Sequence, residues 1–357
     1  MSGEVPVVVG ARASFPFVTL RLRLSLGQTL HDFDQAAEAV RSAFGVERLR
    51  VDPAGPREVE LTFTVCDQLT TPFSAVVGDP SSIHDVMVGR REDGGEWRLA
   101  VGPHTLVAGS SGSGKGSVFW SMAFGLAPQV RAGRVLLHGV DLKGGMEILM
   151  GKGLFTSVAT SAADAVALLE DLAERMRERS QELAGHARTH QQTPESPLHV
   201  VMIDELAALT AYCPERDLQR RADLAINLLC SQGRAPGFVL FACLQDPRKE
   251  VIPSRGLFTQ MVGLRLKDAS ETAMVLGDFA LASGALCHRI GREAPGTGYV
   301  VPEEGGHPIR VRAGYATDDA IRETAEAYAT STTWSIPPLA PAADSSRARR
   351  ARTSEGL

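Results

Sequence analysis

A glycine-rich segment with one lysine constrains the fold of this chain more than any other feature. Gly109 and Gly114 stand five residues apart and Lys115 follows directly, in the spacing G-x-x-x-x-G-K. A short apolar run, residues 104–108, precedes the segment, and an apolar stretch of helical character, residues 118–126, follows it. This order predicts a buried strand, a tight loop and a helix. The backbone N–H groups of such a loop and the positive end of the helix hold a polyphosphate, to which a solvent-facing lysine adds a point charge.

We expect the whole segment to line a nucleotide site. Its members are Gly109, Ser110, Ser111, Gly112, Ser113, Gly114, Lys115, Gly116 and Ser117. The alternative, a glycine-rich turn that binds nothing, is disfavoured because the spacing, the lysine and the flanking runs agree.

One position departs from the usual pattern. The residue after the lysine is normally Ser or Thr, whose hydroxyl binds Mg²⁺, but here it is Gly116, with Ser117 one step later. One step along a helix is a rotation of about 100°, so Ser117 is not a simple replacement. Either the helix begins one residue late and Ser117 reaches the ion, or water and a carboxylate elsewhere hold it.

A second motif complements the first. The apolar run at residues 198–203 ends in two carboxylates, Asp204 and Glu205. A continuously apolar run is typical of a parallel strand buried on both faces, and the carboxyl ends of such strands open on the ligand crevice. We therefore expect the acidic pair beside the phosphate-binding loop, with Asp204 in the Mg²⁺ shell and Glu205 orienting the attacking water.

Composition sets the broad class. At 357 residues, with 44% apolar and 22% charged residues, the chain is an ordinary globular protein large enough for two domains. No apolar run approaches the roughly 20 residues that span a membrane, and the five cysteines are scattered, so we expect a cytoplasmic protein with free thiols. The net charge of −5 does not favour a protein that coats DNA, although DNA inside a ring requires only a few local basic residues.

Patterning along the chain divides it into three parts. Residues 1–84 read as a small α+β domain, because residues 17–24 alternate as a strand and residues 30–44 have helical spacing. Residues 85–333 alternate short apolar strands with helical stretches, which predicts an α/β fold with a mainly parallel sheet flanked by helices. Residues 334–357 are rich in Pro, Ala, Ser and Arg and predict a disordered tail.

Two histidines, His186 and His190, have the i, i+4 spacing of metal ligands on a helix. No further His or Cys lies nearby and their surroundings are loop-like, so we interpret them as surface residues rather than a metal site.

Taken together, six stretches of the sequence resemble one family, the FtsK/SpoIIIE-type DNA-pumping ATPases. The likeness is strongest to the actinobacterial branch, which includes plasmid and integrative-element transfer proteins. The stretches are residues 104–117, 139–147, 201–207, 232–237, 244–248 and 296–300. This resemblance implies a RecA-like P-loop fold, with ATP and Mg²⁺ as cofactors. It also implies that Lys115, Asp204 and Glu205 are catalytic or metal-binding, and that Gln245 senses the γ-phosphate.

The resemblance further implies a motor that moves double-stranded DNA as a homo-hexameric ring, in chromosome segregation or conjugative transfer. In such a ring an arginine from the neighbouring subunit reaches the γ-phosphate, and the candidates here are Arg234 and Arg265. A membrane-associated partner is a further candidate. Two other functions stay open: an ATPase of protein secretion, although such proteins usually carry several motor modules, and a nucleotide-binding module without turnover, which Gly116 would suit.

Overall fold

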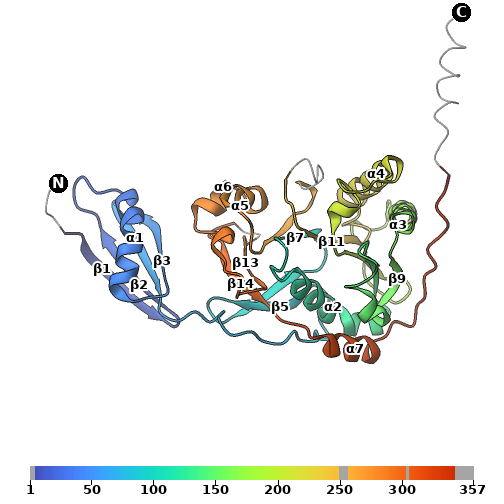
Figure 1. The fold of residues 1–357 in the computed structure, drawn as a ribbon, viewed down its shortest axis with the longest axis horizontal. Coiled ribbons are helices and arrows are strands. Elements are labelled where there is room, and N and C mark those ends of the chain that lie inside the picture. Colours follow the sequence, from blue (N-terminus) through green and yellow to red (C-terminus); the bar gives the residue numbers. More distant parts are fainter. Residues whose placement is uncertain (1–4, 249–255, 303–304, 342–357) are drawn as a thin grey trace, which may run out of the picture.

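A small antiparallel sheet and a large mixed sheet form the body of the protein (Figure 1). The structure is a computed structural model and describes residues 5–248, 256–302 and 305–341. The small sheet has the strand order β1-β2-β4-β3 and one helix, α1, packed on it. The bounds of its elements are β1 Val7–Ser14, β2 Phe17–Arg23, α1 Leu30–Phe44, β3 Arg48–Gly55 and β4 Glu58–Thr64.

The sequence dictates this first unit locally. At the start of α1 the backbone N–H and the hydroxyl of Thr29 both donate to the carboxylate of Asp32, at 2.7 and 2.9 Å, as part of a capping box. Alternate residues of β2 and β4 point to α1, and the small core contains Leu22, Val59 and Phe63. The alternating pattern therefore predicted the buried face correctly.

The large sheet has ten strands in the order β6-β5-β14-β13-β12-β7-β11-β10-β8-β9. The six from β12 to β9 are parallel, and the other four are antiparallel. Their bounds are β5 Asp85–Arg91, β6 Glu96–Ala100, β7 Thr105–Ala108, β8 Val135–Val140, β9 Phe155–Ala159, β10 Leu198–Ile203, β11 Phe238–Leu244, β12 Gln260–Gly263, β13 Thr297–Val300 and β14 Ile309–Ala313. The predicted mainly parallel α/β sheet is confirmed.

The strand order shows which residues separate the loop from the acidic pair. The strand that ends at Asp204, β10, is not the neighbour of β7, which precedes the glycine-rich loop; β11 lies between them. As a result Gln245, the residue after β11, lies between the loop and the acidic pair at the carboxyl edge of the sheet.

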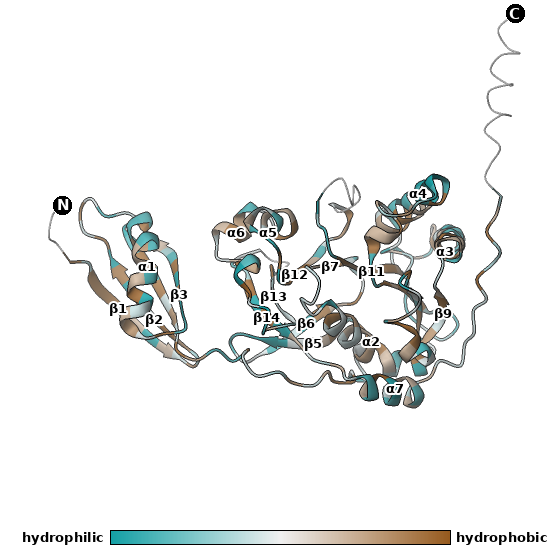
Figure 2. Ribbon diagram, viewed as in Figure 1, coloured by the Kyte–Doolittle hydropathy of each residue, from teal (hydrophilic) through white to brown (hydrophobic). Residues whose placement is uncertain are grey.

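Helices cover both faces of the parallel strands, so both faces are buried. On one face α2 (Lys115–Arg131) and α7 (Asp318–Ala327) pack over a core that includes Leu137 and Met202. On the other, α3 (Ala162–Leu183) and α4 (Arg216–Gln232) pack over a core that includes Val201 and Ile203. Figure 2 shows the interior strands coloured as hydrophobic, while hydrophilic residues mark the outer side of α4. Two short helices, α5 (Ala269–Leu276) and α6 (Asp278–Ala282), pack together beside β12.

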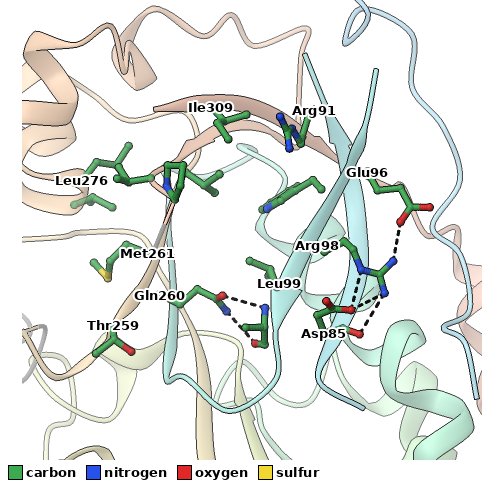
Figure 3. A pocket seen from close by; sticks show the side chains of 16 residues that line it. Asp85, Arg91, Glu96, Arg98, Leu99, Thr259, Gln260, Met261, Leu276 and Ile309 are labelled. Atoms are coloured by element: carbon green, nitrogen blue, oxygen red, sulfur yellow. Dashed lines mark hydrogen bonds and ion pairs between the residues drawn. The ribbon is translucent and has the colours of Figure 1, made fainter. Parts of the chain in front are cut away.

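The strands β5 and β6 form a hairpin at the far end of the large sheet from β9. Beside it lies a cavity of about 590 Å³ that Gln260, Leu276 and Ile309 help to line (Figure 3). At the wall of this cavity, the side-chain amide of Gln260 accepts a hydrogen bond from the N–H of Ala100 and donates one to the carbonyl of Ala100. The cavity is lined by none of the residues expected at the nucleotide site.

Residues 334–341 depart from the expected disordered tail. The Trp334 ring meets His138 and His199 edge-on, with centroid separations of 5.5 Å, and its Nε1 donates to Asp171 at 3.1 Å. Leu339 packs against the core beneath α3 and α4. The composition of this segment did not predict its packing, because only one aromatic ring and two aliphatic side chains supply most of the contact. Residues 342–357, with their four arginines, lie outside the described residues.

No helix in the described parts of the chain is long and apolar enough to cross a membrane.

Candidate functional site

The glycine-rich loop connects β7 to α2 and is held from three sides. The N–H of Gly109 donates to the carbonyl of Leu244 at 2.9 Å, and that of Ser110 to the carbonyl of Arg265 at 2.8 Å. A Cβ on Gly114 would lie 2.1 Å from the backbone N of Gly296, and the φ of Gly114 is 93°. No other residue fits that position, because the left-handed backbone and the close approach both require glycine.

Lys115 is the first residue of α2 and lies within the loop that it follows. Its Nζ donates to the carbonyls of Gly109 and Ser110 at 2.7 and 3.3 Å. The side chain is buried, 9% exposed, rather than solvent-facing as the sequence suggested. Burial lowers the pKa of its ammonium, against the opposing effect of the nearby Glu205. The amine is therefore held in place by its own loop, where an incoming phosphate would exchange for the carbonyls.

Asp204 lies at the end of β10 and is paired with a lysine that the sequence analysis did not assign to the site. The Nζ of Lys143 lies 2.7 Å from Asp204 Oδ2. Burial alone would lower the pKa of Lys143, but the hydrogen bond and the charge of Asp204 outweigh it, and the pKa is raised. The lysine is thus a positive charge at the position where the sequence predicted a metal ion.

Glu205 points away from Asp204, toward the adjoining strand. Its Oε1 accepts the backbone N–H of Gln245 at 3.3 Å, whereas its buried Oε2 has no hydrogen-bond partner in the described structure. Burial raises the pKa of this carboxyl, although the Gln245 N–H and Lys115 oppose the shift. A buried, unpartnered carboxylate oxygen is costly unless a ligand or water completes it, so this atom is a candidate acceptor for a proton from water.

Two adjacent cavities flank the loop. One, of about 790 Å³, contains Lys115, Gly116, Ser117, Asp204 and Gln245 among its lining residues. The other, of about 810 Å³, is lined on its side by Ser110, Ser111, Glu205 and Gln245. Loop, acidic pair and Gln245 therefore converge, but the two carboxylates open on different cavities.

A short loop after β8 brings a third carboxylate, that of Glu147, to the cavity of about 790 Å³. Asp141 accepts the backbone N–H groups of Lys143, Glu147 and Ile148 at 3.0, 2.8 and 3.2 Å, and so shapes the loop. Glu147 accepts a hydrogen bond from Trp120 Nε1 at 2.8 Å. Burial, and then the charge of Asp204, raise the pKa of Glu147. Sequence reasoning did not assign Lys143 or Glu147 a role; the available signal was a polar run directly after a buried strand, as at Asp204.

The donor set around the loop fits a magnesium ion bound together with a nucleotide. The described residues contain no group of three or more His, Cys, Asp or Glu side chains that could hold a metal alone. Mg²⁺ is normally held by one or two carboxylates with phosphate oxygens and waters, and Asp204 and Glu147 line one cavity with the loop. Asp204, the carboxylate predicted from the sequence, would hold the ion, which would neutralise phosphate charge.

The helix start bears on how Ser117 could take part. α2 begins at Lys115, with Gly114 as its N-cap, and the N–H of Ser117 donates to the carbonyl of Gly114 at 3.1 Å. Ser117 is therefore in the first turn, on the wall of the first cavity.

The two arginine candidates lie in different places. Arg265 Nη2 donates to the carbonyl of Ser111 at 2.7 Å, so this arginine contacts the loop of its own chain. Arg234 is exposed and lies just before β11, at the opposite edge of the sheet from Gln245. The positions of Arg234 and Arg265 within one subunit do not test the predicted role between subunits. The two histidines, His186 and His190, lie beyond the end of α3 rather than on a helix, and His190 bonds the carbonyl of Ser196 at 2.8 Å.

Comparison with known proteins accounts for this arrangement. Residues 82–191, which include the loop and Glu147, match the FtsK/SpoIIIE family. The chain is 26% identical over 337 residues to the transfer protein TraSA of Streptomyces ambofaciens, covering 87% of this chain and 79% of that protein. Residues 82–191 thus form an FtsK/SpoIIIE-type segment. The predicted resemblance to the transfer branch of this family is confirmed.

More distant similarities agree with that assignment. The chain is 27% identical over 248 residues to the DNA translocase FtsK of Corynebacterium efficiens, and the match covers 63% of this chain but only 25% of the translocase. The pCW3 conjugation coupling protein TcpA, solved with ATPγS, superposes with a TM-score of 0.63 at 18% identity, covering 91% of this chain and 94% of that one. The RecA-like P-loop fold predicted from the sequence is thereby confirmed. The chain spans about a quarter of the length of this translocase.

Proposed function

We propose that this protein couples ATP hydrolysis to the movement of double-stranded DNA in conjugative transfer or chromosome segregation. The observation that carries the proposal is the convergence of Lys115, Asp204, Glu205 and Gln245 at one edge of the sheet. Its similarity to a transfer protein and to DNA translocases supports DNA as the substrate.

Each residue has a role in this proposal. Lys115 leaves the loop carbonyls for the β- and γ-phosphates, to which the loop N–H groups also donate. Asp204, once released from Lys143, would hold the metal ion, which would neutralise phosphate charge, and Glu205 would accept the proton of the attacking water through Oε2. Gln245, between the loop and the acidic pair, senses the γ-phosphate.

We further propose that the working form is a homo-hexamer around the DNA. An arginine of one subunit then reaches the nucleotide of the next, which commonly increases the rate by a factor of about 10³ or more. Arg234 is the better candidate, because Arg265 contacts its own loop.

Steady-state phosphate release, measured with and without linear double-stranded DNA, tests the function. Turnover that DNA stimulates severalfold, and that Lys115→Ala abolishes, supports the proposal. Nucleotide binding without turnover would instead indicate a regulatory module, and turnover indifferent to DNA would indicate another cargo, such as a secreted protein.

A further inference from the structure

Gly116 and Glu147 lie in contact, although 31 positions separate them in the sequence. A Cβ added to Gly116 would lie 2.8 Å from Glu147 Oε1, and the three atoms nearest to it all belong to the Glu147 carboxylate group. Any side chain at residue 116 would therefore displace this carboxylate. The residue that lacks the usual hydroxyl is the one that leaves room for an acidic oxygen.

Glu147 is positioned, not merely nearby. Trp120, one turn after Gly116 on the same face of α2, donates its Nε1–H to Glu147 Oε1 at 2.8 Å. The backbone N–H of Glu147 is fixed at 2.8 Å by Asp141, the residue that ends β8. Both anchors belong to the elements that form the phosphate cavity, so the carboxylate moves with the cavity.

We propose that Glu147 replaces the missing hydroxyl and is, beside Asp204, a side-chain oxygen ligand of the magnesium ion that accompanies the nucleotide. The inference rests on nucleotide binding at the loop, as in the proposed function, but not on DNA movement. It refines the second of the two arrangements that Gly116 left open, because Glu147 is a carboxylate from elsewhere in the chain, and neither Ser117 nor a water then has to replace the hydroxyl.

The chemistry of the site favours this arrangement. Mg²⁺ prefers hard oxygen ligands and is commonly held by one or two carboxylates. Asp204 is already paired with Lys143, whose amine neutralises it before the metal arrives. Among the described residues, the Glu147 carboxylate accepts a hydrogen bond from the neutral indole N–H of Trp120 and forms no ion pair with a basic side chain. Its negative charge therefore remains available for a cation.

Binding of ADP in EDTA and in saturating Mn²⁺ tests the inference, with Mn²⁺ as the spectroscopically visible substitute for Mg²⁺. The ratio of the two affinities measures the contribution of the metal. We expect Glu147→Gln, which keeps the volume and the acceptor for Trp120, to reduce that ratio by about tenfold or more. Its affinity for metal-free ADP should stay within about twofold of the parent, which also shows that the variant is folded.

A reciprocal exchange sharpens the test. Glu147→Ala should also lose the metal-dependent ratio, whereas adding Gly116→Ser to Glu147→Ala restores a hydroxyl in the space vacated and should recover most of it. Asp318→Asn is the matched control, because it removes a carboxylate that lines the same cavity but is not among the atoms nearest to residue 116.

Two results would overturn the inference. One is a ratio of ADP affinities in Glu147→Gln that stays within twofold of that of the parent. The other is an equal loss of this ratio in Asp318→Asn, which would mean that any negative charge in the cavity has the same effect. A parent protein that binds no ADP in EDTA or Mn²⁺ would overturn both this inference and the proposed function. Normal ADP binding with an unchanged ratio would overturn the inference alone.

Discussion

Lys143 and Asp204 form an ion pair, with Nζ 2.7 Å from Oδ2, at the carboxyl edge of the sheet. The two residues follow neighbouring parallel strands, β8 and β10. Before nucleotide binds, the carboxylate assigned to the metal is thus neutralised by a lysine. Binding of the metal has to displace that lysine, which frees a positive charge beside the incoming phosphates.

Removing this lysine should strengthen metal binding to the nucleotide-free protein. In Lys143→Met, Asp204 loses its partner, and a divalent cation no longer competes with the ammonium. We expect the half-saturating concentration of Mn²⁺, measured by electron paramagnetic resonance, to fall severalfold. Lys152→Met, an exposed lysine nine residues later, is the control and should leave it unchanged. Weaker Mn²⁺ binding in Lys143→Met would contradict competition between the two cations.

Lys115→Ala should abolish nucleotide binding while the protein stays folded. The amine is buried on two carbonyls of its own loop, so its loss removes hydrogen bonds worth about 1 kcal/mol each. It also removes the cost of burying an ammonium group, and we expect the free energy of unfolding to change by about 1 kcal/mol. ADP titration and chemical denaturation measure the two effects separately. If the variant retains full nucleotide affinity, the assignment of the loop is wrong.

Asp204 and Glu205 should have different roles in catalysis, because they line different cavities. Glu205→Gln should bind ATP normally and hydrolyse it about a hundredfold more slowly, the usual scale for losing a positioned general base. Asp204→Asn should instead weaken binding of ATP only when Mg²⁺ is present. Single-turnover hydrolysis and ATP titrations with and without Mg²⁺ measure these effects. Identical behaviour of the two variants would argue against separate roles.

The elements that the sequence predicted are those whose pattern is set locally. The run at residues 198–203 is apolar except for His199 because both faces of β10 are covered, and the loop motif specifies its own strand and helix. The sequence could not place Gln245 between the loop and Asp204, because strand order depends on which strands pair across the sheet. The same limit applies to Glu147, which reaches Gly116 only after β8 and α2 have packed together.

The sequence also did not predict the contacts that a short segment makes with residues far away in the chain. The segment at residues 334–341 is bound by one indole ring, two aliphatic residues and backbone hydrogen bonds, and none of these produces a periodic signal. We expect Trp334→Ala to lower the free energy of unfolding by about 2 kcal/mol, because the ring contacts two buried histidines and the Arg175 guanidinium, 3.9 Å from its centroid. The neighbouring, exposed Ser335→Ala should have no effect in the same denaturation experiment. Equal stability of the two variants would mean that the segment at residues 334–341 does not pack against the rest of the protein in solution.

A buried histidine at the start of β7 should make stability depend on pH. Burial, and then the charge of Arg234, lower the pKa of His104 from 6.5 to about 4. The unfolded chain therefore takes up a proton as the pH falls through 6.5, whereas the folded protein does so only near pH 4. Between these values the unfolded state binds more protons, and the free energy of unfolding should fall by up to about 1.4 kcal/mol per pH unit from this residue.

Denaturant titrations at pH 7.5, 6 and 5 (conditions spanning roughly that window) measure the slope. His104→Asn keeps an acceptor within reach of the backbone N–H of Leu240, which donates to His104 Nδ1 at 3.0 Å, but cannot be protonated. We expect it to be less stable than the parent at pH 7.5, since an imidazole is lost from a buried position, yet to lose less stability on acidification. Because His138 and His199 also have lowered pKa values, part of the slope should persist. A slope identical to that of the parent would show that His104 is not held neutral in the folded protein.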